Sequence, residues 1–94
     1  MALKFEWNSK KAEANLHKHG ISFEEASTVF GDDFSVTISD PLHSEDEERF
    51  LIIGLSSIQR LLVVVHLEKD SFGIRIISAR VATPHERKFY GENL

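Results

Sequence analysis

The chain has 94 residues, 41% hydrophobic and 28% charged, and its 15 acidic residues outnumber its 11 basic ones, for a net charge of −4. A chain of this length and composition closes one hydrophobic core, so we expect a single domain over residues 1–94 and not a disordered or multidomain protein. With no cysteine in the sequence, disulfides, thiolate zinc sites, iron–sulfur clusters and cysteine nucleophiles are excluded.

A short strand over residues 3–7 and a first helix are expected at the N-terminus. Asn8 is a good N-cap, and the helix should extend to about His19. Ala12, Leu16 and His19 recur at helical spacing, which predicts that they form the buried face of this helix.

The second helix has the clearest start signal in the chain. Ser22 and Glu25 are spaced as a capping box, in which each side chain bonds the backbone N–H of the other residue. Phe23, Ala26 and Phe30 then form an apolar stripe, so we expect a buried helix from residue 23 to about residue 30.

From residue 34 onward the apolar residues alternate with polar ones, as they do in strands. Strands are expected over residues 34–39, 49–55, 60–67 and 73–79, the last three joined as an antiparallel meander. The acidic stretch over residues 44–48 is expected to be a solvated loop.

Thr83 and Glu86 form another capping box around Pro84, which predicts a C-terminal helix. The order predicts an α+β fold: two N-terminal helices and a C-terminal helix packed on a small, mostly antiparallel sheet.

Charge is distributed unevenly along the chain, because residues 1–50 carry −6 and residues 51–94 carry +2. The arginines concentrate in the second half, and the guanidinium group matches phosphate and carboxylate in shape and charge. In the last strand Arg75 interrupts an apolar pattern, and in an unbroken strand Arg80 would point to the opposite face. Both approach one site only if a bulge or the strand end falls near Ala79. A salt bridge to a nearby acid is the alternative explanation for Arg75.

Two further side chains are candidates for proton transfer, each with a purely structural alternative. Glu48 is either a member of the acidic loop or a carboxylate that transfers a proton. His19 is either a partly buried residue at a helix end or a histidine that contacts phosphate or carries a proton. His17 and His19 lie about 200° apart on a helix, which does not build a metal site.

Recognisable cofactor and metal motifs are absent from the sequence. It contains no phosphate-binding glycine loop, no Gly-x-Ser-x-Gly, no His-Glu-x-x-His and no dinucleotide fingerprint, so we expect neither a cofactor nor a metal ion. No apolar run approaches the ~20 residues of a membrane helix, and the first residues do not resemble a signal peptide, so we expect a cytoplasmic protein without a membrane partner. The remaining arginines, histidines and Tyr90 suit metal-free phosphoryl chemistry on RNA.

The sequence resembles the BrnT toxin family nearly from end to end. The most specific segments are Lys18-His19-Gly20-Ile21-Ser22-Phe23 and Ile74-Arg75-Ile76-Ile77-Ser78-Ala79-Arg80, the latter followed by Glu86-Arg87 and Tyr90. The resemblance implies a bacterial type II toxin–antitoxin ribonuclease with a RelE-like fold, which inhibits translation by cutting RNA. It also implies a BrnA-like ribbon-helix-helix antitoxin in a 2:2 complex that binds DNA through the antitoxin, and a homodimer is compatible with it.

Carried over by position, the resemblance indicates a candidate site. Its expected catalytic residues are Arg49, Arg75, Arg80, His19, Glu48 and Tyr90, and its expected substrate-binding residues are Lys10, Lys11, Lys18 and Arg87. The arginines would stabilise the phosphate, His19 and Glu48 would carry protons, and Tyr90 would stack on a base or orient the phosphate. Asn8 stands where the family usually has aspartate, and it caps a helix about as well.

Two alternative functions come from other classes. In the first, the chain is a catalytically inactive toxin-like module that acts only as the antitoxin-binding part of an operon-repressing complex. In the second, it is a small-anion binding protein that uses the same arginines. The intact motifs argue against the first, and phosphate binding without RNA cleavage would favour the second.

Overall fold

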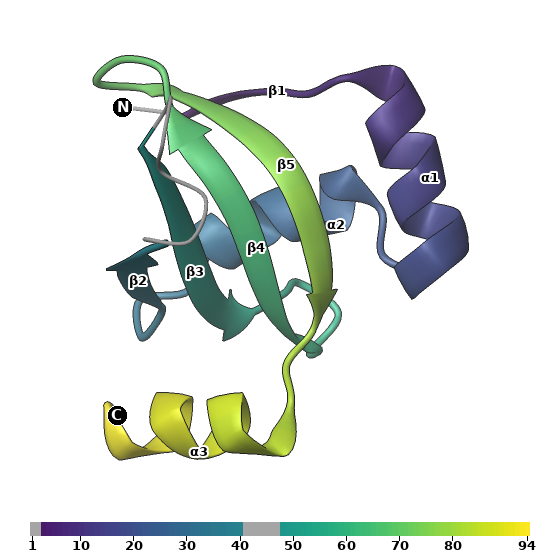
Figure 1. Cartoon of the computed structure of the whole chain (residues 1–94). Coiled ribbons are helices and arrows are strands. Elements are labelled where there is room, and N and C mark those ends of the chain that lie inside the picture. The colour runs from purple at the N-terminus through teal and green to yellow at the C-terminus, as the bar shows by residue number, and fades with distance from the viewer. Residues whose placement is uncertain (1–2, 41–47) are drawn as a thin grey trace.

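A computed structural model describes residues 3–40 and 48–94. In chain order the elements are β1 (Lys4–Glu6), α1 (Ser9–His19), α2 (Phe23–Thr28), the 3₁₀ turn η1 (Val29–Gly31), β2 (Val36–Ser39), β3 (Arg49–Leu55), β4 (Leu61–Glu68), β5 (Gly73–Val81) and α3 (Pro84–Glu92) (Figure 1). The predicted α+β class is confirmed, and the acidic stretch over residues 44–48 lies almost entirely outside the described residues. Among the described helices, none is long and apolar enough to cross a membrane.

The five described strands form one mixed sheet in the order β1-β5-β4-β3-β2. The pairs β2–β3, β3–β4 and β4–β5 are antiparallel, as the meander predicted, whereas β1 runs parallel to β5. Figure 1 shows α2 against one face of this sheet, α1 beside the β5 edge, and α3 at the end where β5 finishes. We call the face that α2 packs on the covered face, and the opposite one the open face.

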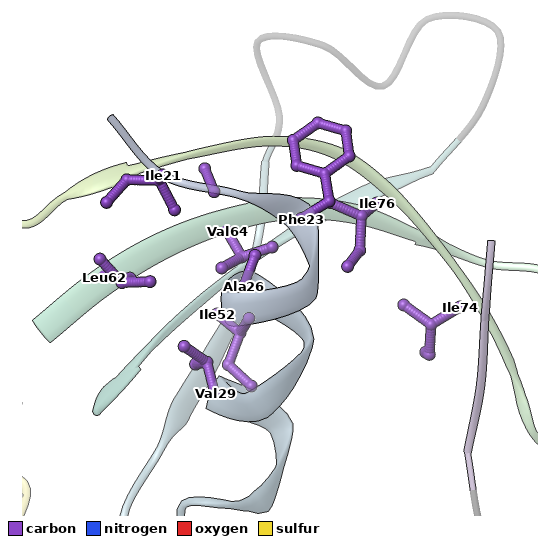
Figure 2. Close-up of a cluster of buried hydrophobic side chains, with 10 residues drawn as sticks. Ile21, Phe23, Ala26, Val29, Ile52, Leu62, Val64, Ile74 and Ile76 are labelled. Carbon is purple, nitrogen blue, oxygen red and sulfur yellow. The ribbon is translucent and has the colours of Figure 1, made fainter. Parts of the chain in front are cut away.

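The main hydrophobic core lies between α2 and the covered face. It consists of Ile21, Phe23, Ala26, Val29, Ile52, Leu62, Val64, Ile74, Ile76 and Ala79, all buried (Figure 2). The expected inward stripe of the second helix is therefore correct for Phe23 and Ala26, although the α-helix ends at Thr28 and a 3₁₀ turn continues to Gly31. A second cluster on the open face joins α3 to the sheet through Ile53, Leu61, Val63, Ala82 and Tyr90.

The expected buried face of the first helix was wrong for Leu16 and His19, although Ala12 is partly buried and packs against the core. Leu16 is 50% exposed and His19 is exposed, whereas Asn15 is buried. The Asn15 amide accepts from Ala79 N–H at 3.0 Å and donates to Ala79 O at 2.9 Å and Ile21 O at 3.0 Å. The helix thus packs on the edge of β5 through a polar residue that satisfies backbone groups there, an arrangement that apolar periodicity cannot predict.

The two predicted capping boxes had different outcomes. At α3 both reciprocal bonds form between Thr83 and Glu86, which confirms the box. At α2 the Ser22 hydroxyl accepts from Glu25 N–H at 3.0 Å, but the Glu25 carboxylate instead pairs with Arg60 and accepts from the Ser56 hydroxyl. A full ionic partner outweighs a neutral N–H donor, so tertiary contact replaced half of this box.

Candidate functional site

A bulge in β5 decides which side chains share the open face. Val65 of β4 pairs with Ser78 and His66 pairs with Ile76, so Ile77 is an extra residue without a partner in the ladder. One extra residue reverses the alternation of the strand beyond it. Ile74, Ile76 and Ala79 therefore lie on the covered face, and Arg75, Ser78 and Arg80 lie on the open face.

The same bulge brings the candidate arginines together on the open face. Arg75 pairs with Leu67 and Arg80 pairs with Val63, two β4 residues of the open face, and Ser78 lies between them opposite Val65. Arg49 of β3 also pairs with Leu67, so it belongs to the same face. From the sequence, Arg75 and Arg80 were expected to share one site only if a bulge or the strand end fell near Ala79. The structure places the bulge two residues earlier, at Ile77.

Both β5 arginines bind carboxylates from elements outside the meander. Arg75 Nη1 donates to Glu6 Oε2 at 2.6 Å, so the salt bridge considered as the alternative for Arg75 is present. Arg80 makes a bidentate pair with Glu86, with Nη1–Oε1 at 2.7 Å and Nη2–Oε2 at 2.9 Å. The bonds from Arg80 lower the pKa of Glu86 to about 2. Arg80 in turn has its pKa raised by this partner, so both groups are charged over the whole physiological range.

A hollow of about 210 Å³ lies next to the bulge of β5, where α1 lies beside the β5 edge. Its lining includes three cationic or titratable side chains of α1, Lys11, Lys18 and His19, together with Ile77 and Ser78 of the bulge. Ser78 lines the hollow and also lies between Arg75 and Arg80 on the open face, so it links the hollow to the two arginines along β5. This region, Lys11, Lys18, His19, Arg75, Ser78 and Arg80, is the candidate site.

Other predicted site residues lie apart from the candidate site. Glu48 lines a second hollow of about 330 Å³ with Phe50, Leu67, Glu68 and Lys69. This hollow lies where β4 ends. Lys10 and Arg87 are exposed and line neither of these two hollows.

Tyr90 is buried in the second hydrophobic cluster and has a structural partner. Its hydroxyl donates to Asp32 Oδ2 at 2.6 Å, and Asp32 also accepts from Leu55 N–H at 2.9 Å. Burial and the Asp32 carboxylate raise the pKa of Tyr90 to about 12. The ring is therefore placed to pack α3 on the sheet and has no exposed face for a base.

Several residues important to the site were not singled out from the sequence as members of it. Glu6 and Glu86 bind the two arginines, and Asn15 holds α1 against β5. Glu86 carried two signals, its place in the capping box and its place after the Ile74–Arg80 segment of the resemblance, and neither concerned its pairing with the arginine. Across residues 3–40 and 48–94 no group of three or more His, Asp or Glu side chains is arranged to hold a metal ion.

Comparisons with known proteins agree with this architecture. The model of a family described as the ribonuclease toxin BrnT of type II toxin–antitoxin systems matches residues 7–86. Among solved structures, the Brucella abortus ribonuclease toxin BrnT is similar with a TM-score of 0.63 at 21% sequence identity, covering 87% of this chain and 99% of that one. At that identity the likeness concerns the fold. No curated protein matches the chain.

Proposed function

Because the chain belongs to the BrnT family of ribonuclease toxins of type II toxin–antitoxin systems, we propose that it is an endoribonuclease that cuts RNA without a metal ion. The reaction is attack of a ribose 2′-oxygen on the adjacent phosphorus with departure of the 5′-oxygen. Its products are a 2′,3′-cyclic phosphate and a 5′-hydroxyl. A base takes the proton of the 2′-hydroxyl, and an acid supplies one to the leaving oxygen.

The observation that supports this proposal most is the bulge at Ile77, since it sets Arg75 and Arg80 on one face beside a basic hollow. In the proposed reaction both guanidinium groups stabilise the negative charge that accumulates on the phosphate oxygens. Arg49, on the same face, contributes from β3, on the other side of β4.

The residues on α1 supply proton transfer and binding in this proposal. His19 is exposed at the hollow, and an imidazole ring can both accept and donate a proton, which suits a proton carrier. Lys11 and Lys18 line the same hollow and bind the phosphates that flank the cut bond. Lys10 and Arg87 extend this binding along the exposed surface. Glu48 is a second proton carrier in this proposal, because it lines the hollow beside Leu67, the residue that pairs with both Arg49 and Arg75.

The family implies a protein antitoxin as partner. We infer that it is a BrnA-like ribbon-helix-helix protein that neutralises this chain, forms a 2:2 complex and carries the complex onto operator DNA. The proposal includes a RelE-like fold, action on translation in a bacterial cytoplasm, and a homodimer as the state of the toxin within that complex.

Cleavage of a defined RNA by the purified chain in the presence of EDTA tests the reaction. We expect cleavage to persist in the chelator and the upstream fragment to end in a cyclic phosphate, which mass spectrometry identifies. Cleavage that stops in EDTA and returns with added metal would refute the metal-free reaction. Intact RNA under all conditions, with a folded protein that still binds the antitoxin, would leave only a binding role.

A matched pair of variants tests the role of the arginines. Arg60 is bound by Glu25 in a two-point pair similar to that of Arg80 with Glu86, but it lies where β4 begins, beside Gly20. Arg80→Lys and Arg60→Lys each keep the charge and lose the fork. We expect Arg80→Lys to lose at least about tenfold in kcat and Arg60→Lys to stay within about twofold. Equal losses in both would show that only general stability was affected.

A further inference from the structure

Glu86 connects two elements that meet at the candidate site. Its carboxylate accepts from Arg80 Nη1 and Nη2, and Oε1 also accepts from Thr83 N–H at 2.8 Å. In return the Thr83 hydroxyl accepts from Glu86 N–H at 3.2 Å. The carboxylate is therefore held by the start of α3 as well as by the arginine, and rotating away would cost it the bond from Thr83 N–H, which is half of the capping box.

The pair leaves a defined edge of the Arg80 guanidinium available. Glu86 uses the end of the fork, where Nη1 and Nη2 lie side by side. The side edge consists of Nε–H and the second N–H of Nη2, and it bonds no acceptor within residues 3–40 and 48–94. A side edge of this kind binds two oxygens of one phosphate. The side chain of Arg80 is 40% exposed and that of Glu86 is 20% exposed, so the arginine is more accessible to solvent than the carboxylate that binds it.

We propose that Glu86 is a positioning residue for the RNA cleavage reaction, which holds the guanidinium of Arg80 so that its side edge meets the phosphate under attack. This inference rests on the proposed function and names a residue that acts through Arg80 without touching RNA. An arginine has many rotamers of similar energy, and fixing one in advance removes that entropic cost from the transition state.

The ionisation of Glu86 agrees with positioning and not with proton transfer. Its pKa lies near 2, because Arg80 and the Thr83 N–H both favour the carboxylate, so it holds no proton at neutral pH. The comparable pair on the same strand is looser. Arg75 and Glu6 make one bond between side chains that are 34% and 51% exposed. Positioning by a carboxylate is thus a feature of Arg80 more than of Arg75.

A competing interpretation is that Glu86 occupies Arg80 and keeps phosphate away. The two differ in kinetics. If Glu86 positions Arg80, Glu86→Gln lowers kcat and leaves KM unchanged or lower, because a negative charge near the RNA has been removed. If Glu86 competes with phosphate, the same variant lowers KM and keeps or raises kcat.

The experiment is steady-state cleavage of one synthetic RNA by the purified full-length chain and its variants. Glu86→Gln keeps an oxygen that can accept from Thr83 N–H, but it loses the bidentate pair. We expect its kcat to fall about tenfold or more. Thr83→Ala removes the cap hydroxyl and leaves the Glu86–Arg80 pair, and its kcat should stay within about twofold. Circular dichroism at the assay temperature confirms that each variant is folded.

The double variant Arg80→Met/Glu86→Gln separates positioning from a structural role of α3. If Glu86 acts through Arg80, adding Glu86→Gln to Arg80→Met causes no further loss of kcat. An equal further loss in that background, or unchanged kcat in the single variant, would overturn the inference while leaving the ribonuclease intact. Absence of cleavage by the wild-type chain would overturn the proposed function and this inference with it.

Discussion

The two faces of the sheet are built from the same three long strands but serve different purposes. The covered face is closed by α2 over isoleucine, leucine and valine, and even its one histidine, His66, is buried beside Phe30 and Phe50. The open face carries Arg49, Arg75 and Arg80, and α3 packs on only part of it. Burial that stabilises the fold is concentrated on one face, so the other can hold charges near solvent.

The bulge at Ile77 keeps the two faces distinct. If β5 ran through Ile77 without a bulge, a strand with Ile74 and Ile76 on the covered face would place Ala79 on the open face and Arg80 against the core. A buried arginine without a partner is expensive, so the bulge protects the core and supplies the site together.

The largest effect should follow from opening a cavity under α2. Phe23 is fully buried and meets Trp7 edge to face with ring centroids 5.9 Å apart. Phe23→Ala should lower the free energy of unfolding by about 3–5 kcal/mol, measured by urea denaturation. Phe34→Ala, at a phenylalanine that is 60% exposed, is the control and should cost about 0.5 kcal/mol or less. Similar losses at both positions would contradict the difference in packing.

The next effect concerns the edge where the two faces meet. Asn15→Ala removes three hydrogen bonds and leaves the N–H and C=O of Ala79 without that partner, so it should cost about 2–4 kcal/mol. Amide hydrogen exchange at Ala79 should accelerate. Leu16→Ala, on the exposed side of the same helix, should change stability by less than about 0.5 kcal/mol. Undiminished protection of the Ala79 amide would show that α1 is held by other contacts.

A change of pH should affect the covered face specifically. Burial lowers the pKa of His66, so the folded chain binds a proton there only at a lower pH than the unfolded chain, which binds it near pH 6.5. Stability is therefore lost as pH falls below that value, by up to about 1.4 kcal/mol per pH unit, until the folded pKa is reached. Urea denaturation at pH 7 and pH 5 measures the slope, which His66→Phe should reduce. His17→Gln, at an exposed position, should leave it unchanged.

The smallest effect separates packing from chemistry on the open face. Tyr90→Phe removes the bond to Asp32 and should cost about 0.5–1.5 kcal/mol. In the wild-type chain the contribution of this bond should persist to about pH 10 and decline towards pH 12, because the folded pKa of Tyr90 is raised to about 12. RNA cleavage by Tyr90→Phe should stay within about twofold of wild type. A loss comparable to that of Arg80→Lys would bring Tyr90 back into the reaction.

The order and approximate bounds of the elements were predictable, because they depend on local signals. Asn8, Ser22 and Thr83 all cap the helices that their spacing indicated. The limits of β3 agree with the prediction, and those of β4 differ by one residue at each end. Where several local signals agree, tertiary contacts rarely reverse them.

The candidate site was predictable in composition but not in arrangement. Arg75 and Arg80 could be named, yet their common face depends on a bulge that leaves no mark in the pattern of Ile76, Ile77 and Ser78. The inward side of α1 was missed because Asn15 is buried by backbone bonds, and periodicity counts only apolar residues. Glu25 and Glu86 occupy equivalent places in the two predicted capping boxes, and only the tertiary structure decides which arginine each one meets.

The parallel pairing of β1 with β5 has a consequence for the order in which the chain can fold. Lys4 pairs with Gly73 and Glu6 with Arg75, so the first strand can pair only with residues that follow it by nearly seventy positions in the chain. The contact of Asn15 with Ala79 spans a similar distance. Contacts of such long sequence separation form slowly, and during synthesis they form only after the second partner has left the ribosome. Glu6 and α1 therefore join the arginines only after β5 has been synthesised, and a nascent chain that stops before β5 has no assembled site.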